Sequence, residues 1–498
     1  MVSSPKRVPT RKIPLYTRFS TAHNRYLYDA VSQSFLQISP AVYDLVDDFI
    51  AHGCESERLT RDGNGRYEAA VVEEARREVQ EAANEGMLLS EPAELGSFGS
   101  MIDIEKTLRK HCHQIVLEMT RSCNLRCRYC IFSGLHGDYP AHADRHMPRE
   151  RIEEAIRFYM VHSREEEQLA VSFYGGEPLL RFAEMKHAVW YAKRLAGEKP
   201  IHFNLTTNGT LLMPEVVDYL VNNDFFLAVS LDGPAIVHDR FRVFDGGAPT
   251  HAAVVGALSR LKEQYPEYYR TRLLLNVVLG PGVDFEQLEA FFSEALTCDL
   301  PLTITGIDDP DGEFEQQFNP ENEISRGFEK LEERYRQNVV EGVKPSRFLR
   351  SLFDANLAKI QRRPISTNLP EFIHPNGICL PGKRRFFVDI DGEIHPCEKL
   401  ARTMPIGTIR DGFDTAKIAE YVEIYRGISK EDCSRCWAMR WCTLCFKSAL
   451  GNEGLDAATK HGYCENVKSS WKRAFALYCS ILEQNSEALN FLKSVTFS

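Results

Sequence analysis

Three closely spaced cysteines are the residues of this chain best suited to chemistry. Cys123, Cys127 and Cys130 form a C-x3-C-x2-C triad directly after an apolar, strand-like segment at 113–120. Three thiolates at this spacing suit an iron–sulfur cluster better than zinc, because zinc sites normally draw on two pairs of ligands. A cubane cluster is usually held by four cysteines, so a triad leaves one iron open to another ligand. We expect the chemistry to occur at that open iron.

A second group of cysteines lies near the C-terminus. Two cysteines flank Gly392, a C-x2-C-x5-C-x2-C run follows at 433–445, and one more cysteine comes after it. The scattered Cys54, Cys112, Cys298 and Cys479 are predicted to be buried apolar side chains. The group itself predicts further metal centres, and its members are Cys379, Cys397, Cys433, Cys436, Cys442, Cys445 and Cys464.

A glycine-rich turn follows the predicted strand at 169–174. The run Tyr-Gly-Gly-Glu-Pro occupies 174–178, some forty-five residues after the triad. Glycines let the backbone approach a ligand closely, and a carboxylate with backbone carbonyls accepts hydrogen bonds from an ammonium group. In isolation this run would predict only a turn. Its place after the triad and after a strand favours a binding function.

The triad and the glycine-rich turn resemble the signature of radical S-adenosylmethionine (SAM) enzymes. The resemblance implies that the open iron binds SAM, that a reduced cluster cleaves SAM to a 5′-deoxyadenosyl radical, and that the glycine-rich turn holds the SAM amino group. Segments 206–209 and 230–233 resemble family segments that reach the ribose and carboxylate of SAM, although turns or helix caps would also explain them. An aromatic residue beside the last triad cysteine would contact the adenine. The implied SAM-binding residues are Tyr129, Gly175, Gly176, Glu177, Asn208, Ser230 and Asp232.

The C-terminal cysteines resemble the SPASM domain, an extension of radical SAM maturases that carries two auxiliary clusters. The resemblance implies that Cys379, Cys397 and Cys445 hold the first auxiliary cluster. It assigns the second cluster to the other four cysteines of the group: Cys433, Cys436, Cys442 and Cys464. The family usually has three residues between the last two cysteines of the central run, whereas this chain has two. In all, the resemblance implies SAM and three 4Fe–4S clusters.

The first auxiliary cluster lacks a fourth cysteine between its opening two ligands, because residues 380–396 contain none. Either this cluster has an open iron, or a residue from elsewhere such as Cys112 or His395 completes it. Glu398 follows Cys397, and an acidic residue at this place in sulfatase-maturing relatives is a proposed base. The resemblance therefore implies that Glu398 takes a proton from the substrate, and a solvent-facing carboxylate is the alternative.

Composition sets the broad class. The chain has 498 residues, 43% apolar content and 26% charged content, which is typical of a globular protein with two to four domains. A net charge of −10 argues against a general nucleic-acid binder, which would show a basic stripe. The N-terminus has no apolar signal region, and no stretch of eighteen uninterrupted apolar residues occurs. We therefore expect a cytoplasmic protein without disulfides and without membrane contact.

Apolar strand runs alternate with amphipathic helical stretches through the middle of the chain. This alternation predicts an α/β fold of parallel strands with right-handed crossovers, and six such units resemble the partial (β/α)6 barrel of radical SAM enzymes. Reactive groups of such a barrel gather where strands end. The expected strands are 114–120, 169–174, 202–207, 226–231, 273–279 and 302–307.

The N-terminal hundred residues predict a small separate module. Residues 25–38 alternate as a strand, Ser39 and Pro40 fit the cap and first position of a helix, and a second helix is expected at 68–85. The order resembles the winged-helix, PqqD-like element that captures a leader peptide at a sheet edge. A purely structural domain is the alternative.

The remaining boundaries follow from composition and motifs. The Pro-rich, charged helical stretch at 311–375 is predicted to be a linker. A β-hairpin is expected around Asp391 and Gly392. The expected domains are a peptide-recognition module at 1–100, a radical SAM barrel at 101–310, a helical linker at 311–375, and a SPASM domain with C-terminal helices at 376–498.

The implied function is maturation of a ribosomally made precursor peptide. The adenosyl radical would remove a hydrogen atom, and the substrate would close an intramolecular thioether or carbon–carbon crosslink. Ferredoxin or flavodoxin would supply electrons, and the N-terminal module would bind the leader. A sulfatase-maturing, formylglycine-forming enzyme and a peptide epimerase are the alternatives.

Overall fold

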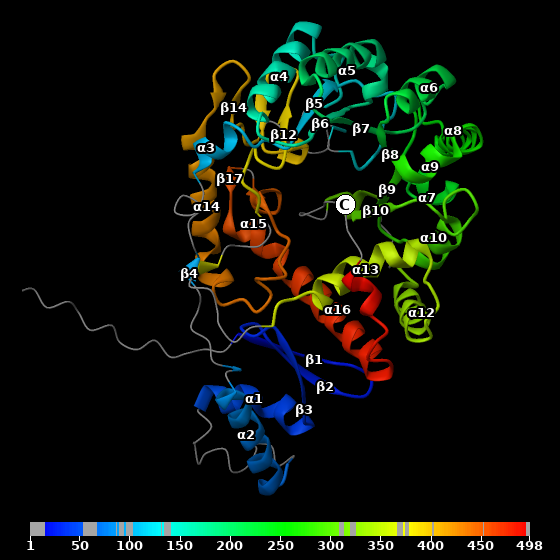
Figure 1. The fold of residues 1–498 in the computed structure, drawn as a ribbon. Coiled ribbons are helices and arrows are strands. Elements are labelled where there is room, and N and C mark those ends of the chain that lie inside the picture. The colour runs from blue at the N-terminus through cyan, green and yellow to red at the C-terminus, as the bar shows by residue number, and fades with distance from the viewer. Residues whose placement is uncertain are drawn as a thin grey trace, which may run out of the picture.

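A computed structural model gives the fold (Figure 1). The described residues are 15–52, 67–85, 87–88, 94–95, 103–130, 132–133, 141–307, 313–318, 325–365, 372–373, 378–400, 403–451 and 453–494. Cys54 lies outside this part of the chain.

Six parallel strands form the middle of the molecule, as the sequence predicts. Each follows its neighbour in chain order, and each begins and ends within one residue of its expected bounds. The sheet is not closed, which agrees with a partial barrel. The strands are β5 (Gln114–Thr120), β6 (Leu169–Gly175), β7 (Ile201–Thr207), β8 (Phe226–Ser230), β9 (Leu273–Leu279) and β10 (Leu302–Gly306).

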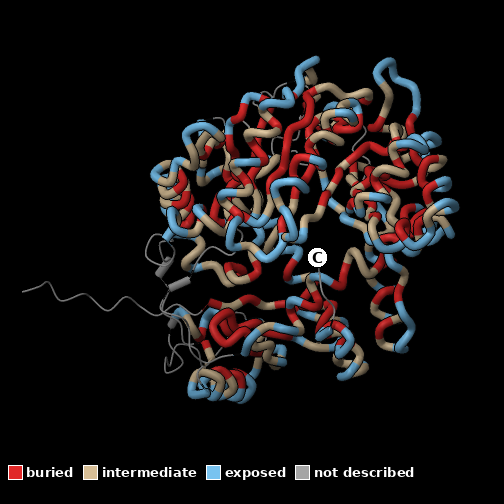
Figure 2. Tube along the Cα trace, turned by 45° about the horizontal axis from the view of Figure 1, so that its top comes forward, coloured by how far each residue is buried: buried red, intermediate tan, exposed pale blue. Residues whose placement is uncertain are grey.

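Alternation along these strands separates two faces of the sheet. Val171 and Phe173 of β6 join the main core beneath the helices, while Ser172 and Tyr174 lie on the opposite face. Figure 2 shows the buried strands inside a shell of more exposed helices. The helices are α4 (Arg149–His162), α5 (Phe182–Ala196), α6 (Pro214–Asn222), α7 (Ala235–Phe241), α8 (His251–Gln264), α9 (Pro266–Arg272) and α10 (Phe285–Phe292).

The predicted hairpin forms and extends the same sheet. β12 (Phe386–Val388) pairs antiparallel with β13 (Glu393–His395), and β12 also pairs parallel with β5. The hairpin continues through β14 (Gly407–Thr408) and β15 (Gly412–Phe413), which gives a ten-stranded sheet. The C-terminal cysteine region is therefore joined to the first barrel strand by backbone hydrogen bonds.

The N-terminal module is a three-stranded antiparallel sheet with two helices. The expected single strand at 25–38 is wrong, because the chain turns between β2 (Arg25–Asp29) and β3 (Ser34–Ile38). The carboxylate of Asp29 accepts hydrogen bonds from the backbone and hydroxyl of Ser32, which closes this turn. The other elements are β1 (Tyr16–Ser20), α1 (Pro40–His52) and α2 (Ala69–Asn84), and both predicted helices are confirmed.

This N-terminal sheet is covered on both faces. One face packs on α1 and α2, and the other packs on α16 (Cys464–Gln484), which lies between the module and the rest of the molecule (Figure 1). Tyr28 contacts Phe475 of α16 with ring centroids 4.9 Å apart, and its hydroxyl accepts a hydrogen bond from Trp441 Nε1 at 2.8 Å. The module thus contacts the loop that carries Cys442.

The helices described within 313–365 pack into the main body. Tyr335 and Phe348 are fully buried, and the hydroxyl of Tyr335 donates to Asp354 at 2.7 Å. These helices are α11 (Glu313–Phe318), α12 (Phe328–Val340) and α13 (Arg347–Gln361); the helices elsewhere are α3 (Ile104–Leu108), α14 (Thr415–Cys433) and α15 (Ala457–Gly462). The short strands are β4 (Glu94–Leu95), β11 (Phe372–Ile373), β16 (Leu450–Gly451) and β17 (Gly454–Leu455). In the part of the chain that is described, no helix is both long and apolar enough to span a membrane.

Candidate functional site

The triad lies in the loop that follows β5. The sulfurs of Cys123 and Cys130 accept backbone hydrogen bonds from Leu125 and Phe132, each at 3.4 Å. Burial raises the pKa of Cys123 to about 12 and that of Cys130 to about 11. Buried thiols of this kind ionise when a metal binds, because the metal supplies the positive charge that the protein interior lacks.

The spacing of the sulfurs fits a cluster better than a zinc ion. Four thiolates around one zinc ion lie about 3.8 Å apart, because each zinc–sulfur bond is about 2.3 Å long. No three cysteine sulfurs within the described ranges lie within 4.8 Å of one another. A four-iron cluster holds its thiolates farther apart, because each thiolate binds a different iron.

The two glycines of the 174–178 turn allow the triad loop to approach β6. A Cβ atom on Gly176 would lie 2.0 Å from the carbonyl oxygen of Ser122, and one on Gly175 would lie 2.3 Å from that of Thr120. The backbone of Gly176 donates to Thr120 at 2.7 Å, and that of Glu177 donates to Ser122 at 2.9 Å. From the sequence, these glycines are predicted to let the backbone approach a ligand closely. The structure shows a close approach between two loops of the protein.

Glu177 is fully enclosed between β6 and β7. Its carboxylate accepts hydrogen bonds from the hydroxyl of Thr207 at 2.8 Å and from the backbone of Asn208 at 2.8 Å and Leu179 at 3.1 Å. Burial raises the pKa of Glu177 to about 7 despite these three donors. The carboxyl group therefore changes its charge near neutral pH.

This titration predicts a pH-dependent affinity for SAM, which carries a positive sulfonium and an ammonium group. Glu177 is neutral below its pKa of about 7 and negative above it, so the dissociation constant should fall on the order of tenfold as the pH rises from about 6 to about 8. In Glu177→Gln the affinity should be lower and should vary little over this range. Isothermal titration with SAM at several pH values, under anaerobic conditions, measures both. An equal pH response in the variant would contradict the assignment.

Asn208 connects the end of β7 to the triad. Its side-chain amide donates to Asn124 Oδ1 at 2.8 Å and approaches the sulfur of Cys123 at 3.9 Å. Its carbonyl oxygen accepts hydrogen bonds from the backbone and hydroxyl of Thr210. Asn208, a predicted SAM contact, therefore lies beside the triad. Its side chain is held by Asn124 on one side and by Thr210 on the other.

Asp232, Tyr129 and Arg242 form one buried group. Asp232 Oδ2 accepts from the hydroxyl of Tyr129 at 2.6 Å and from Arg242 Nε at 2.8 Å, and its Oδ1 accepts from the backbone of Val278 at 3.0 Å. The guanidinium of Arg242 also lies 5.2 Å from the ring centroid of Tyr129. Tyr129 and Asp232, both predicted to bind SAM, are thus hydrogen-bonded to each other. Ser230, at the end of β8, is buried on the inner face of the sheet, which is the face opposite the helices.

Two residues of this site are absent from the sequence-based prediction. Arg242 Nη1 approaches the sulfur of Cys127 at 3.9 Å, and His238 Nδ1 accepts a hydrogen bond from the backbone of Asp232 at 3.2 Å. Burial lowers the pKa of His238 to about 3, so the ring is neutral and its other nitrogen faces the hydroxyl of Thr250. Their position within ten residues of the Asp-Gly turn is the signal that could have found them.

The C-terminal cysteines gather in two sets. Burial, together with the nearby Glu398, Cys379 and Cys445, raises the pKa of Cys397 to about 12. In the second set the thiol of Cys442 is influenced by Cys433 and Cys464, and that of Cys436 by Cys433 and Cys442. These influences agree with the sets that the SPASM resemblance implies, while the ligand sets and their occupation by clusters stay predictions.

Known proteins place this site in a family. The family model described as Radical SAM superfamily matches residues 117–295, which hold the triad, the glycine-rich turn and the ends of β7 and β8. Residues 117–295 are a radical SAM domain, and the chain is an enzyme.

Two curated relatives and one solved structure extend the comparison. A serine-type anaerobic sulfatase-maturating enzyme of Bacteroides thetaiotaomicron is 32% identical over 150 residues, which cover 29% of this chain and 35% of that relative. A cysteine-type enzyme of Clostridium perfringens is 22% identical over 377 residues, covering 72% of this chain and 95% of that relative. The structure of native anSMEcpe with bound AdoMet and Cp18Cys peptide has a TM-score of 0.53 at 19% identity, covering 74% of this chain and 99% of that one. This last likeness concerns the fold.

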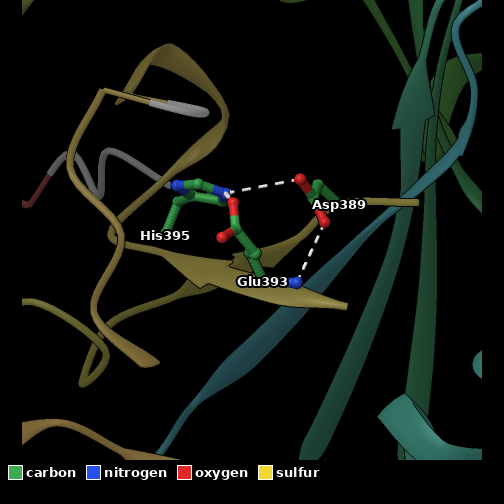
Figure 3. A group of neighbouring side chains, drawn as sticks. All are labelled: Asp389, Glu393 and His395. Atoms are coloured by element: carbon green, nitrogen blue, oxygen red, sulfur yellow. Dashed lines mark hydrogen bonds and ion pairs between the residues drawn. The ribbon is translucent and has the colours of Figure 1, made fainter. Parts of the chain in front are cut away.

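The two proposed fourth ligands of the first auxiliary set have other contacts in this enzyme. The thiol of Cys112 is fully buried and donates to the carbonyl of Leu108 at 3.5 Å. His395 is also fully buried, and its Nε2 points to Asp389 Oδ2 at 3.7 Å (Figure 3). A fourth ligand for this set stays an open prediction.

Asp389, Glu393 and His395 form a compact group at the hairpin turn (Figure 3). Arg121 Nη2 lies 3.8 Å from Asp389 Oδ2, so a guanidinium already supplies positive charge there. Arg121 also pairs with Glu118, whose Oε2 accepts a hydrogen bond from the backbone of Ile390 at 3.0 Å. We interpret this group as an ionic brace between the triad loop and the hairpin.

Glu398 lies beside Cys397, with its carboxylate paired to Arg385. Arg385 Nη1 reaches the two carboxylate oxygens at 3.0 and 3.2 Å. The carboxylate is mostly buried, so the alternative of a solvent-facing side chain does not hold.

Proposed function

We propose that this enzyme oxidises a peptidyl substrate by removing a hydrogen atom at the triad and one electron at the first auxiliary set. The relatives support a protein or peptide substrate, because the two curated ones are sulfatase-maturating enzymes and the solved one is bound to a peptide. Their similarity does not distinguish a sulfatase from a precursor peptide.

The residues present fit the implied cofactors. Cys123, Cys127 and Cys130 would hold one 4Fe–4S cluster, and the two C-terminal sets would hold auxiliary clusters. With SAM bound, the first of these supplies a 5′-deoxyadenosyl radical that removes a hydrogen atom. Asn208 and Glu177 shape the cofactor pocket, and Asp232 fixes the Tyr129 ring at its wall. A protein reductant such as ferredoxin or flavodoxin would deliver the electron.

The position of Tyr174 carries this proposal. Burial raises the pKa of its phenol, and Glu398, Cys130 and Cys397 raise it further because all three lie close to it. Its ring packs against Phe387 of the hairpin, with centroids 6.5 Å apart. One side chain on the inner face of the sheet is therefore near both the triad and the first auxiliary set. A substrate carbon placed there would have its radical source and its electron acceptor close by.

Glu398 is the proposed proton acceptor for this oxidation. Loss of one hydrogen atom and then one electron leaves a cationic carbon centre, which becomes a closed-shell product when a proton leaves. Arg385 holds the carboxylate beside Cys397, and the same carboxylate influences Tyr174.

We favour a precursor peptide as the substrate because of the N-terminal module. That module presents a small sheet whose edge strands, β1 and β3, offer a place for leader-peptide addition. It also contacts the second cysteine set through Tyr28 and Trp441, so a bound leader would lie against the auxiliary domain. The expected product is a thioether or carbon–carbon crosslink. Sulfatase maturation is the second candidate, favoured by the coverage of the Clostridium enzyme.

Peptide mass spectrometry tests the proposal. The reconstituted enzyme is incubated with SAM, a reductant and either short peptides encoded beside its gene or a sulfatase-derived Cys or Ser peptide. Loss of two hydrogens with a fragmentation-resistant segment is expected for a crosslinked precursor. Formylglycine in the sulfatase peptide would identify the second candidate. An unchanged mass with deuterium uptake from heavy water would indicate the epimerase and would overturn the oxidation.

A further inference from the structure

Lys460 is a buried lysine within the second cysteine set. It lies on α15, a short helix that begins after Asp456, whose carboxylate accepts a hydrogen bond from the backbone of Thr459. The side chain is only 1% exposed. Its Nζ donates to the sulfur of Cys433 at 3.2 Å and to the hydroxyl of Ser429.

The ammonium group has no acidic partner nearby. Across the described ranges, no carboxylate oxygen lies within 4.0 Å of Lys460 Nζ, since its contacts are a thiol, a hydroxyl and the ring of Tyr425 at 4.6 Å. A buried charge without a counter-ion is costly, so buried lysines normally lie against an anion. The thiolates of the second set are the groups that can supply it.

The acidic residues around this set have other cations. Asp432 pairs with His461 at 3.0 Å, and Glu465 pairs with Lys468 at 2.8 Å. Both carboxylates are largely exposed to solvent, where charges are screened. Lys460 is therefore the buried charge that acts on the second set.

The triad has a different electrostatic environment. Arg242 approaches Cys127 at 3.9 Å, but Asp232 lies 2.8 Å from the same guanidinium and balances its charge. The two sites thus differ in the net positive charge beside their thiolates, with the excess at the second auxiliary set.

We propose that Lys460 is the counter-ion of an iron–sulfur cluster held by Cys433, Cys436, Cys442 and Cys464, and that it raises the reduction potential of this cluster. The inference rests on the auxiliary-cluster assignment in the proposed function. Reduction adds one negative charge to a cluster, and an adjacent ammonium in a dry environment stabilises that added charge. A hydrogen bond to a ligating sulfur acts in the same direction.

The raised reduction potential predicts where the electron released by substrate oxidation goes. The substrate radical loses one electron and becomes a closed-shell product when its proton leaves, and the auxiliary clusters gain that electron. The cluster beside Lys460 holds it until a one-electron carrier of the ferredoxin or flavodoxin class removes it. The hydroxyl of Tyr425 donates to the carbonyl of Leu444 at 2.8 Å, and Leu444 stands in the chain between Cys442 of one set and Cys445 of the other.

A potentiometric titration followed by electron paramagnetic resonance tests the inference. The full-length reconstituted protein carries alanine at all three triad positions, so the signals come from the auxiliary sets. Lys460→Met removes the charge, Lys460→Gln keeps an N–H donor without the charge, and Lys460→Arg keeps both. Lys430→Met removes an exposed lysine from neighbouring α14 as the matched control. Iron content is measured for every variant.

The two neutral variants should shift one auxiliary couple to a more negative potential. We expect at least a tenfold change in the ratio of reduced to oxidised cluster, about 59 mV for a one-electron couple, with Lys460→Arg close to the parent. Loss of iron from the second set in both neutral variants and its retention in Lys460→Arg would also support the proposal, since the charge is then what the cluster requires.

Shifts in the neutral variants no larger than that of Lys430→Met would overturn the proposal, and so would a parent protein without iron at the second set. The peptide assay on the wild-type enzyme is interpreted independently of the measured potentials. An enzyme with the expected potentials and no modified peptide would contradict the proposed function alone. A modified peptide with unshifted potentials would contradict only the role of Lys460.

Discussion

An enzyme in which Cys123, Cys127 and Cys130 are all replaced by alanine should cleave no SAM and modify no peptide. These thiols follow β5. Cys123 lies beside Asn208, whose backbone donates to Glu177, and Cys127 lies beside Arg242, which pairs with Asp232. The auxiliary sets lie on other segments, so they should keep their share of the iron. Anaerobic reconstitution followed by iron analysis and detection of 5′-deoxyadenosine measures both expectations.

Replacing Cys298 by alanine is the control for loss of a cysteine elsewhere in the same domain. Its thiol contacts a backbone carbonyl at 3.9 Å and adjoins no other cysteine sulfur among its recorded contacts, so cleavage should be unchanged. Persistent SAM cleavage in the triple variant would place the reactive cluster at one of the C-terminal sets.

Gly176→Ala should reduce SAM cleavage about 100-fold or more, because displacement of a reacting group by about 1 Å is enough for such a loss. A Cβ at this position would lie 2.0 Å from the carbonyl oxygen of Ser122, a backbone atom that cannot rotate away. The loop after β6 or the triad loop must move, and the hydrogen bonds from Gly176 to Thr120 and from Glu177 to Ser122 hold those loops together. SAM affinity and 5′-deoxyadenosine formation are measured on matched preparations.

Gly427→Ala provides the comparison. Gly427 lies within α14 and a Cβ there meets nothing within 4 Å, so alanine should leave SAM cleavage intact and stabilise the helix by up to about 1 kcal/mol. Normal cleavage by Gly176→Ala, with cluster content equal to that of the wild type, would show that the contact between the two loops is dispensable.

Much of the barrel could be predicted from local sequence patterns. Parallel strands covered on one face by helices are continuous apolar runs, and those at 114–120 and 273–279 begin and end as predicted. The N-terminal strand shows where a local pattern misleads. Apolar and polar residues alternate through 25–38. The chain nevertheless turns within that run, because the carboxylate of Asp29 accepts hydrogen bonds from Ser32.

The spacing of the triad likewise indicates that its three thiols belong together, while their surroundings could not be predicted. Arg242 is 115 residues from Cys127, and Ile390 is 272 residues from Glu118, so no local pattern connects them. The addition of β12 to the edge of β5 brings the auxiliary domain to the triad, and backbone pairing of this kind carries no residue-specific signal.

The sequence by itself determined the strand order, the triad and the glycine-rich turn, because each depends on residue types at short, fixed spacings. The tertiary structure alone decided the electrostatics. It put Asp232 against Arg242 beside the triad, and it left Lys460 against Cys433 without a carboxylate among the described residues. The energy of a buried charge depends on which distant groups the fold brings within a few ångströms, and sequence spacing does not contain that information.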